Sequence, residues 1–521
     1  MIRCSYPIGN LVLSLIILIL LVSACTSLVP IPDELDTDAY SCMQEYDPKG
    51  DPMVRKNGDP APESSFLTVN RSIEALEWRQ AMADKAEHTL DIQYFLWQND
   101  DTGLLLISHV LAAADRGVRV RLLMDDLLSH EWSRKAIILN SHPGIEIRVF
   151  NPFKKMRGAM GQRAFELFTE LDRLNHRMHN KLFLSDQQVA MIGGCNIGNN
   201  YFGAGKKYNY RDYDLITMGP VVEELVDSFE TFWNSAWSYP LKTLEPVETS
   251  KDINELRNQL ADTVSSSKLL AAEFQVAPRD WSDLINAAKE RVITGRARAV
   301  FDCPPSYDDR QFPVQTAFTL KKVSLNAEQE ILIISPYVVP LEQLFDHFRQ
   351  AIDQGKKVRI YTNSMASSDH TYAFSGYAKH RSELLSIGVM LRELKPDAAI
   401  SEIHLTPSST SKYLSMHAKL VVFDQQRIYI GSMNLDPRSG HWNTELGLLI
   451  DSPELAVQIY EDFSGDFQPE STWLVEMRDQ EGRQQTYWVD REREITKEPS
   501  RSLGQNIASW FYSFFPLDEH L

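Results

Sequence analysis

The chain has 521 residues, of which 43% are hydrophobic and 24% are charged. This composition is typical of a globular protein with room for two or three domains, and it excludes a disordered or fibrous chain. Acidic residues outnumber basic residues by 71 to 53, which gives a formal net charge of −18. Because such a field repels nucleic acid unless a local basic groove overcomes it, we expect no nucleic-acid partner.

The N-terminus differs from the rest of the chain. Arg3 precedes an uninterrupted apolar run, LVLSLIILILLV at 11–22, and small residues and Cys25 follow it. This order is typical of a bacterial export signal, and the stretch VSAC resembles a lipobox, which predicts a signal peptide over 1–24 and a lipid-modified Cys25 as the first mature residue. The alternative is an uncleaved transmembrane anchor, since the apolar run is about long enough to span a bilayer. Both alternatives predict a membrane-tethered protein of the bacterial cell envelope that faces the periplasm, and Thr26, where an aspartate would resemble an inner-membrane retention signal, favours the outer membrane.

The other cysteines do not form a metal-binding pattern. Cys42, Cys195 and Cys303 are widely spaced and lack any CxxC or Cys/His cluster, so we expect no metal and no cofactor. A disulfide between Cys42 and Cys303 would suit an oxidising compartment, and the sequence leaves their proximity open. Cys195 is expected to be a small buried residue.

The first folded unit is predicted over 65–245, after a tether over 25–64 that is rich in Pro, Asp and Gly. The run HTLDIQYFLW at 88–97 has the β-branched and aromatic residues of a strand. Apolar residues at helical spacing follow it as far as Gly117, which suits a helix C-cap. The next run, VRVRLLMDD, alternates like a second strand.

The second folded unit is predicted over 265–470, and it repeats this order. EILIISPYVV at 330–339 is strand-like, PLEQLFDHFRQAIDQG has helical spacing, and KKVRIYTNS follows as a strand. Alternating strands and helices predict an α/β fold of two duplicated sandwich domains, each with a mostly parallel sheet flanked by helices. A C-terminal tail is expected over 471–521.

The strongest signal is a motif that occurs twice, first as HNKLFLSDQQVAMIGGCN and later as HAKLVVFDQQRIYIGSMN. Counted from the histidine, both copies have lysine at +2, aspartate at +7, glycine at +14 and asparagine at +17. The matching residues are His179, Lys181, Asp186, Gly193 and Asn196, and His417, Lys419, Asp424, Gly431 and Asn434. Histidine and lysine two apart on a strand share a face, and a hairpin at DQQ can return the asparagine towards them.

Two copies supply the groups that phosphodiester chemistry needs. One neutral imidazole attacks phosphorus to give a phosphohistidine, while the other donates a proton to the leaving oxygen and then activates the incoming hydroxyl. The lysines and asparagines can balance charge on the non-bridging oxygens, a role that a metal fills in other sites. The alternative is a duplicated motif kept for folding without catalysis.

The pattern HxKxxxxDxxxxxxGxxN in two copies resembles the phospholipase D superfamily. Its context, with DIQYFLW, YNYRDYD and GSMNLDPRSGHWNTELG, is most similar to bacterial cardiolipin synthases of the C type. The resemblance implies two domains related by a pseudo-twofold axis, and a transphosphatidylase that passes a phosphatidyl group to a histidine and then to phosphatidylglycerol. It implies His179 as the nucleophile and His417 as the acid, with the reverse order left open. Phosphatidylglycerol and phosphatidylethanolamine both stay open as donors, and the oligomeric state stays open as well.

The resemblance also implies an acidic residue after each motif that orients its histidine. Glu445 in NTELG has this place in the second half. In the first half no acidic residue has the same offset, and Asp212 in YRDYD is assigned ahead of Asp214.

Two further positions of the motifs are expected to be structural or to differ between the halves. Asp186 and Asp424 are expected to stabilise the hairpin turns rather than to touch phosphate. Gly194 stands where the family often has serine, and the second copy has Ser432 there.

Three functions stay open on the sequence. A membrane-anchored phosphatidyltransferase is favoured by the tether, the acidic charge and the resemblance. A hydrolytic phospholipase D or a phosphodiesterase or nuclease would use the same histidines with water as the acceptor, because acceptor choice depends on pocket dryness and lipid access. A non-catalytic envelope scaffold is the third candidate.

Overall fold

The computed structural model describes most of the chain. The described residues are 51–54, 58–126, 133–153, 163, 165–166, 169–244, 253–274, 280–305, 315–407, 409–411 and 413–512. The predicted signal peptide over 1–24, Cys25 and Cys42 therefore lie outside the described residues. Within the described ranges, no helix has both the length and the apolar character that crossing a membrane requires.

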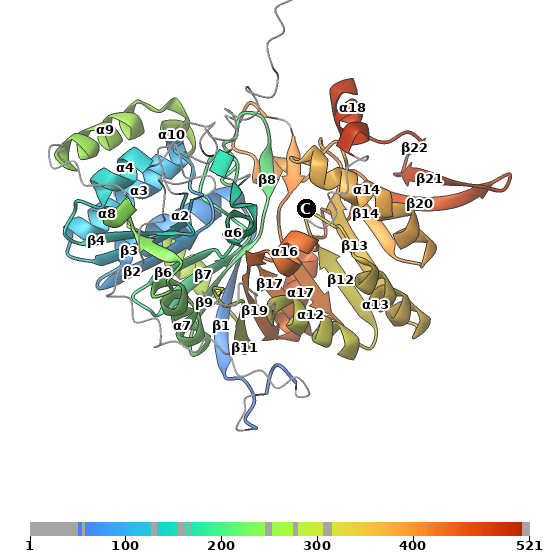
Figure 1. Ribbon diagram of the computed structural model, residues 1–521, viewed down its shortest axis with the longest axis horizontal. Helices are drawn as coiled ribbons and strands as arrows, with labels where there is room; N and C mark the ends of the chain where they lie inside the picture. Colours follow the sequence, from blue (N-terminus) through green and yellow to red (C-terminus); the bar gives the residue numbers. More distant parts are fainter. Residues whose placement is uncertain are drawn as a thin grey trace, which may run out of the picture.

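The two halves of the protein share one large β-sheet, with β1 and β11 adjacent at its centre (Figure 1). Across the first half the strand order is β10 (Ser238–Pro240), β4 (Ile145–Phe150), β3 (Arg119–Asp125), β2 (Thr89–Tyr94), β6 (Leu182–Ser185), β7 (Val189–Gly193), β9 (Asp214–Met218) and β1 (Glu63–Val69). The order continues through β11 (Ile293–Phe301), β19 (Leu446–Asp451), β17 (Arg427–Gly431), β16 (Leu420–Phe423), β12 (Glu330–Ile334), β13 (Lys357–Asn363), β14 (Met390–Leu394), β20 (Thr472–Gln480), β21 (Arg483–Val489) and β22 (Glu494–Ile495). Read outwards from the β1–β11 pair, the second half repeats the order of the first.

The α/β fold and its internal repeat are confirmed, but the prediction of mostly parallel sheets is wrong. In the large sheet, the parallel pairings join β2 to β3, β3 to β4, β12 to β13 and β13 to β14. Each of these pairs is connected through a helix, as parallel neighbours require. The motif strands instead follow one another through tight turns and pair antiparallel, as β6 does with β7 and β16 with β17. The antiparallel β1–β11 pairing then joins the two halves into one sheet.

Helices flank this sheet or pack on the helices that flank it. In the first half they are α2 (Ser72–Lys85), α3 (Asp101–Asp115), α4 (Ser133–Leu139), α6 (Leu171–Asn175), α7 (Val221–Trp233), α8 (Leu241–Leu244), α9 (Ile253–Ser266), α10 (Lys268–Glu273) and α11 (Ser282–Lys289). In the second half they are α12 (Gln315–Asn326), α13 (Glu342–Asp353), α14 (Thr371–Ser386), α15 (Ser401–His404), α16 (Pro437–His441), α17 (Pro453–Asp462) and α18 (Leu503–Tyr512). Of these, α9 packs on α3, and α18 packs on α14.

The hydrophobic core has three main clusters. One packs α2 and α3 on the first half of the sheet, and a second packs α12, α13 and α14 on the second half. The third is shared, because Phe66, Met178, Met416 and Leu446, which come from both halves, are buried together in it. Burial of this shared apolar surface fixes the two halves against each other.

Segments next to the predicted units also pack on them. Helix α9 begins at Ile253, between the two predicted units. It buries Leu256, Leu260 and Val264 in the first-half core. After the second unit, β20 pairs with β14 and extends the sheet. Cys303 is disulfide-bonded, whereas Cys195 is free and buried.

Candidate active site

Short strands outside the large sheet cross between the two halves of the protein. β5 (Arg177–Met178) pairs in parallel with β18 (Asn443–Thr444), and β15 (Leu414–Met416) pairs in parallel with β8 (Asn209–Arg211). The two motif histidines come directly after β5 and β15. The crossed pairings therefore bring each histidine to residues of the opposite half.

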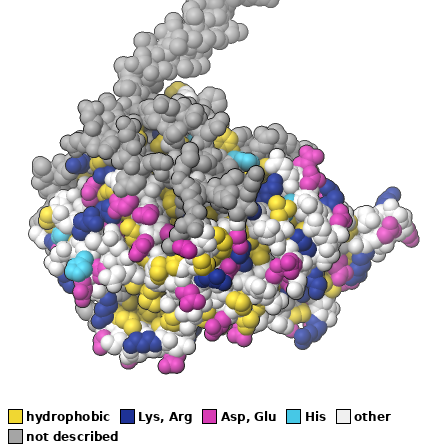
Figure 2. Space-filling view, turned by 90° about the horizontal axis from the view of Figure 1, so that it is seen from below, with side chains coloured by type: hydrophobic (Ala, Val, Ile, Leu, Met, Phe, Trp, Pro, Cys, Tyr) yellow, Lys and Arg dark blue, Asp and Glu magenta, His cyan; other side chains and the backbone are white. Residues whose placement is uncertain are grey.

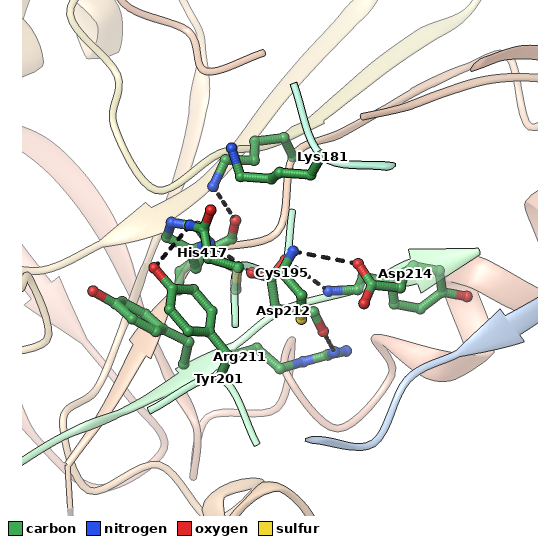
Figure 3. A network of polar contacts seen from close by, with 12 residues as sticks. Lys181, Cys195, Tyr201, Arg211, Asp212, Asp214 and His417 are labelled. Carbon is green, nitrogen blue, oxygen red and sulfur yellow. Dashed lines mark hydrogen bonds and ion pairs between the residues drawn. The ribbon is translucent and has the colours of Figure 1, made fainter. Parts of the chain in front are cut away.

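The residue after each partner strand is a carboxylate, Glu445 after β18 and Asp212 after β8. Glu445 Oε2 lies 2.9 Å from His179 Nδ1. Asp212 Oδ2 lies 2.6 Å from His417 Nδ1, and both residues are labelled in Figure 3. Each carboxylate was predicted to orient the histidine of its own half. In the structure each one contacts the histidine of the other half. With Nδ1 directed at a carboxylate, Nε2 of each ring is the atom available for chemistry.

The two motif lysines are buried beside the histidines. Lys181 Nζ donates to the backbone oxygen of His179 at 2.5 Å, and Lys419 Nζ donates to that of His417. Burial lowers the pKa of Lys181 to about 7, and the positive charge of Lys419 adds to the effect. Burial makes the charged forms of both lysines less stable. A bound anion would stabilise these charged forms, so the two lysines are suited to binding one.

Burial in the site favours neutral histidines. Burial lowers the pKa of His179 to about 4, although Glu445 opposes this effect. Burial and the charge of Lys419 likewise lower the pKa of His417 to about 4, against the opposing charges of Asp212 and Asp369. A phosphodiester anion between the rings would raise both pKa values, so that substrate itself can promote protonation of one histidine.

The two motif asparagines have different surroundings. Asn196 Nδ2 donates to the hydroxyl of Tyr201 at 2.9 Å, and its Oδ1 accepts from the amide of Leu96 at 3.2 Å. Asn434 is also buried, but its Oδ1 has no hydrogen-bond partner within the described residues. Asn434 therefore has unused hydrogen-bonding capacity in the interior of the protein.

The glycine and serine that differ between the motifs face the two carboxylates. Ser432 Oγ donates to Glu445 Oε2 in the second half. A Cβ atom at Gly194 would lie 2.1 Å from Asp212 Oδ1 and 2.9 Å from the backbone oxygen of His417. Glycine at 194 thus leaves the space that the shorter aspartate side chain needs to reach its histidine.

The two motif aspartates lie at the turns that follow β6 and β16. Asp186 accepts the amides of Glu87, His88 and Thr89 at 2.7 to 2.9 Å. Asp424 accepts the three corresponding amides, which are those of residues 328 to 330. Each aspartate therefore fixes its hairpin to the first residues of the neighbouring strand, at the opposite end of the motif strand from the histidine.

Aromatic and acidic residues that the sequence analysis did not assign surround His417. The rings of Tyr210 and Tyr201 lie 4.6 Å and 5.3 Å from the His417 ring, centre to centre. The hydroxyls of Tyr210 and Tyr337 donate to Asp369, at 2.7 Å for Tyr210 Oη to Oδ2. Asp369 lies six residues after the end of β13 (369 − 363), and the signal available in the sequence was the polar stretch that follows this parallel strand.

Asp214, the second candidate for an orienting residue, has a different role. Its Oδ2 forms an ion pair with Arg79 at 2.8 Å, and its Oδ1 accepts the amide of Cys195 at 3.3 Å (Figure 3). In the part of the chain that the structure describes, no cluster of three or more His, Cys, Asp or Glu side chains could hold a metal ion.

Comparisons with known proteins place the chain in one family. A family model described as "Cardiolipin synthase, PLD-like domain" matches residues 80–233 and 322–467, one match in each half. Cardiolipin synthase C of Escherichia coli K12 is 34% identical over 469 residues, which cover 87% of this chain and 95% of that protein. A cardiolipin synthase of Oceanobacillus iheyensis is 24% identical over 399 residues, covering 76% of this chain and 67% of that protein.

Among solved structures, a phosphatidylserine synthase of Haemophilus influenzae has the same fold. It superposes with a TM-score of 0.52 at 15% sequence identity, and the match covers 78% of this chain and 86% of that one. The fold and the paired motifs define this protein as an enzyme of the phospholipase D superfamily, a transphosphatidylase or phosphodiesterase. Within the superfamily, the chain belongs to the family of cardiolipin synthases with PLD-like domains.

Proposed function

We propose that this protein is a phosphatidyltransferase that makes cardiolipin from phosphatidylglycerol through a phosphohistidine intermediate. The observation that carries the proposal is the pair of His–carboxylate contacts that cross between the halves, His179 with Glu445 and His417 with Asp212. Two buried lysines beside them provide positive charge for a phosphodiester. The cardiolipin synthase relatives support a phospholipid as the substrate.

In the first step, Nε2 of His179 attacks the phosphorus of the donor lipid and forms a P–N bond. The P–O bond to the headgroup breaks, and His417 donates the proton that the leaving oxygen takes up. Lys181 and Lys419 stabilise the charge that develops on the non-bridging oxygens. With phosphatidylglycerol as the donor the released alcohol is glycerol, and with phosphatidylethanolamine it is ethanolamine.

In the second step, His417 accepts the proton of the headgroup hydroxyl of a second phosphatidylglycerol. The oxygen attacks phosphorus, the P–N bond to His179 breaks, and cardiolipin leaves. The assignment of His417 as the acid is supported by its surroundings, because Asp369 lies near it in addition to Asp212 and both favour the imidazolium.

Hydrolysis is the competing function, with water in place of the second lipid. The same histidines would serve it, so product analysis must separate the two. On the face in Figure 2, Lys and Arg side chains are interspersed with Asp, Glu and hydrophobic side chains, an arrangement that suits a lipid better than a polyanionic nucleic acid.

We further propose that the mature protein is anchored in the bacterial envelope through a lipid on Cys25. The proposal is supported by the apolar run over 11–22 and by the VSAC stretch. It would keep the enzyme at the surface of its substrate, because the substrate is itself a membrane lipid.

The test of the transfer reaction is lipid analysis of cells that lack endogenous cardiolipin synthases. The intact protein and a His88→Ala control, which replaces an exposed histidine outside the site, are expected to restore cardiolipin. His179→Ala is expected to produce none. Phosphatidic acid without cardiolipin would leave the hydrolase as the function, and equal lipid profiles for all three proteins would exclude catalysis at these histidines.

The roles of the two histidines can be separated with a phosphodiester that carries a p-nitrophenyl leaving group. Such a leaving group needs little protonation, so His417→Ala should still form the phosphohistidine and release one equivalent of p-nitrophenol in a burst. His179→Ala should show no burst. The reverse pattern would assign the nucleophile to His417.

A further inference from the structure

A mainly apolar cavity of about 350 Å³ lies in the second half of the protein, between α12, α13 and the sheet strands β12 and β16. This volume is within the range of small-molecule binding sites, roughly 300 to 1,000 Å³. Its wall includes Ala317, Leu320, Ile333, Leu344 and Val421. The cavity is therefore a preformed space whose wall is mainly apolar, although Ser324, His347 and Asp436 also line it.

The first half shows why this space is open. Leu90 pairs with Ser185 and Ile331 pairs with Phe423, which are the same motif position. The motifs are 238 residues apart (417 − 179), but β2 and β12 correspond with an offset of 241 residues (331 − 90). The helices keep this offset, since α2 ends at Lys85 and α12 at residue 326. Side chains on these elements can therefore be compared one by one.

In the first half, large side chains occupy the space between α2 and the sheet. Arg79 is fully buried, donates to the hydroxyl of Tyr94 at 2.9 Å and forms an ion pair with Asp214 at 2.8 Å. At the offset of 241, Leu320 replaces Arg79 and Ser335 replaces Tyr94, and both line the cavity. A buried polar cluster of the first half is thus replaced by shorter side chains in the second.

The third member of the cluster is missing as well. Asp214 pairs with Gly193, and the matching glycine of the second motif, Gly431, pairs with Gly447. No carboxylate is present at this position of the second half to hold a buried cation. The second half therefore lacks the whole Arg–Tyr–Asp cluster, and apolar space lies between its helices and sheet.

The lining of the cavity includes a residue of the catalytic motif. Asn434, the buried asparagine of the second motif, lines the cavity, and so do the exposed residues Gln343 and His441. Asn434 is 6% exposed, and its Oδ1 has no partner within the described residues. An apolar chain in the cavity would therefore begin beside a free polar group that belongs to the phosphate site.

We propose that this cavity binds one acyl chain of the phospholipid substrate while its phosphate lies between the two histidines. The glycerol ester end would lie at Asn434, and the methylenes would lie among the aliphatic side chains of α12, α13 and the sheet. The inference rests on the proposed phosphatidyl transfer, and it adds where the lipid chain binds and why the two halves differ. Burial of methylenes in such a site is favourable, whereas a charged or strongly polar ligand has few partners there.

The first test fills the cavity. Ala317→Trp is expected to lower the rate with dioleoyl phosphatidylglycerol in mixed micelles by about tenfold or more, since each excluded methylene costs about a factor of four. Hydrolysis of bis(p-nitrophenyl) phosphate, which has no chain, should stay within about twofold of the wild-type rate. Leu325→Trp, an exposed position on the same helix, is the control and should leave both rates unchanged.

Leu344→Trp fills the cavity from α13 and gives an independent variant if Ala317→Trp does not fold. Either filled variant that folds should show the selective loss with the long-chain lipid. Wild-type rates with dioleoyl phosphatidylglycerol in a filled and folded variant would overturn the proposal.

The second test locates the chain directly with phosphatidylglycerol that carries a diazirine near one acyl end. Irradiation of the intact protein should label peptides of α12 or α13, and Ala317→Trp should lose this label. A protein that makes cardiolipin but is labelled only elsewhere would overturn the acyl site. Labelling of α12 or α13 without cardiolipin synthesis would instead refute the proposed transfer and leave the lipid-chain site in place.

Discussion

At the scale of single residues, the site depends on a small number of buried charged groups whose positions are set by close packing. His179 and His417 each have one carboxylate partner, and each lies beside a buried lysine. Their lowered pKa values follow from burial, which the sequence motif does not reveal. The difference between Gly194 and Ser432, in contrast, was visible in the sequence, and the structure supplies its reason.

The packing at Gly194 leads to a first prediction. Gly194→Ser should lower kcat/KM for phosphatidylglycerol, whose alcohol leaving group needs a proton, by about tenfold to 100-fold, because displacement of Asp212 misorients His417. Ser432→Gly removes a single hydrogen bond to Glu445 and should cost only about fivefold, or about 1 kcal/mol. Wild-type kcat/KM in a folded Gly194→Ser protein would show that Asp212 does not need this space.

The histidine pKa values lead to a second prediction, about stability and pH. The pKa of each motif histidine is about 4 in the folded protein, lowered from 6.5 by burial, so the unfolded chain binds more protons between these values. Stability should therefore fall as the pH decreases from about 6.5 to 4, by up to about 3 kcal/mol for each histidine. Urea unfolding of the wild-type protein and of His417→Gln should show a shallower decline in the variant. Parallel stability curves would contradict this expectation.

At the scale of the elements, short strands and turns assemble the site. The β5–β18 and β15–β8 pairings carry the histidines to the opposite carboxylates, although each contains only two or three residues per strand. The hairpins after β6 and β16 are fixed by Asp186 and Asp424 through three backbone amides each. Asp186 and Asp424 have backbone φ angles of 52° and 53°, a conformation that aspartate and asparagine adopt more readily than most residues.

The hairpin contacts lead to a third prediction. Asp186→Asn keeps the turn conformation but removes the charge and one acceptor oxygen, so the free energy of unfolding should fall by about 1 to 3 kcal/mol. The kcat/KM of the folded fraction should not change, because Asp186 lies at the far end of β6 from His179. Asp353→Asn, an exposed position on α13, is the control and should leave stability unchanged. A loss of kcat/KM without a loss of stability would assign Asp186 to the chemistry instead.

At the scale of the whole molecule, a duplicated unit has become one enzyme with two unlike halves. The β1–β11 pairing and the shared core hold the motifs together, so one chain contains a complete site. The halves differ where the Arg79 cluster of the first half corresponds to the cavity of the second.

The proposed anchor leads to a fourth prediction. Cells that express the protein with labelled palmitate should incorporate label into the wild-type chain and not into Cys25→Ala. The unlabelled variant should also retain its uncleaved N-terminus, because lipidation precedes cleavage in this type of signal. Cys195→Ala is the matched control and should be labelled normally, since Cys195 is buried. Label on Cys25→Ala would refute the anchor without affecting the catalytic proposal.

The sequence by itself determined the repeat, the α/β class and the residues of both motifs, because these depend on local spacing and on side-chain chemistry. Asp212 was also selected from the sequence, but its contact with His417 was not, since that contact depends on strands that cross between the halves. Only the tertiary structure decided the mainly antiparallel sheet, the buried surroundings of the charged groups and the place of Asp369 near His417. The cavity beside Asn434 also belongs to this second group, because an apolar space is defined by side chains from several elements and has no signature in any one of them.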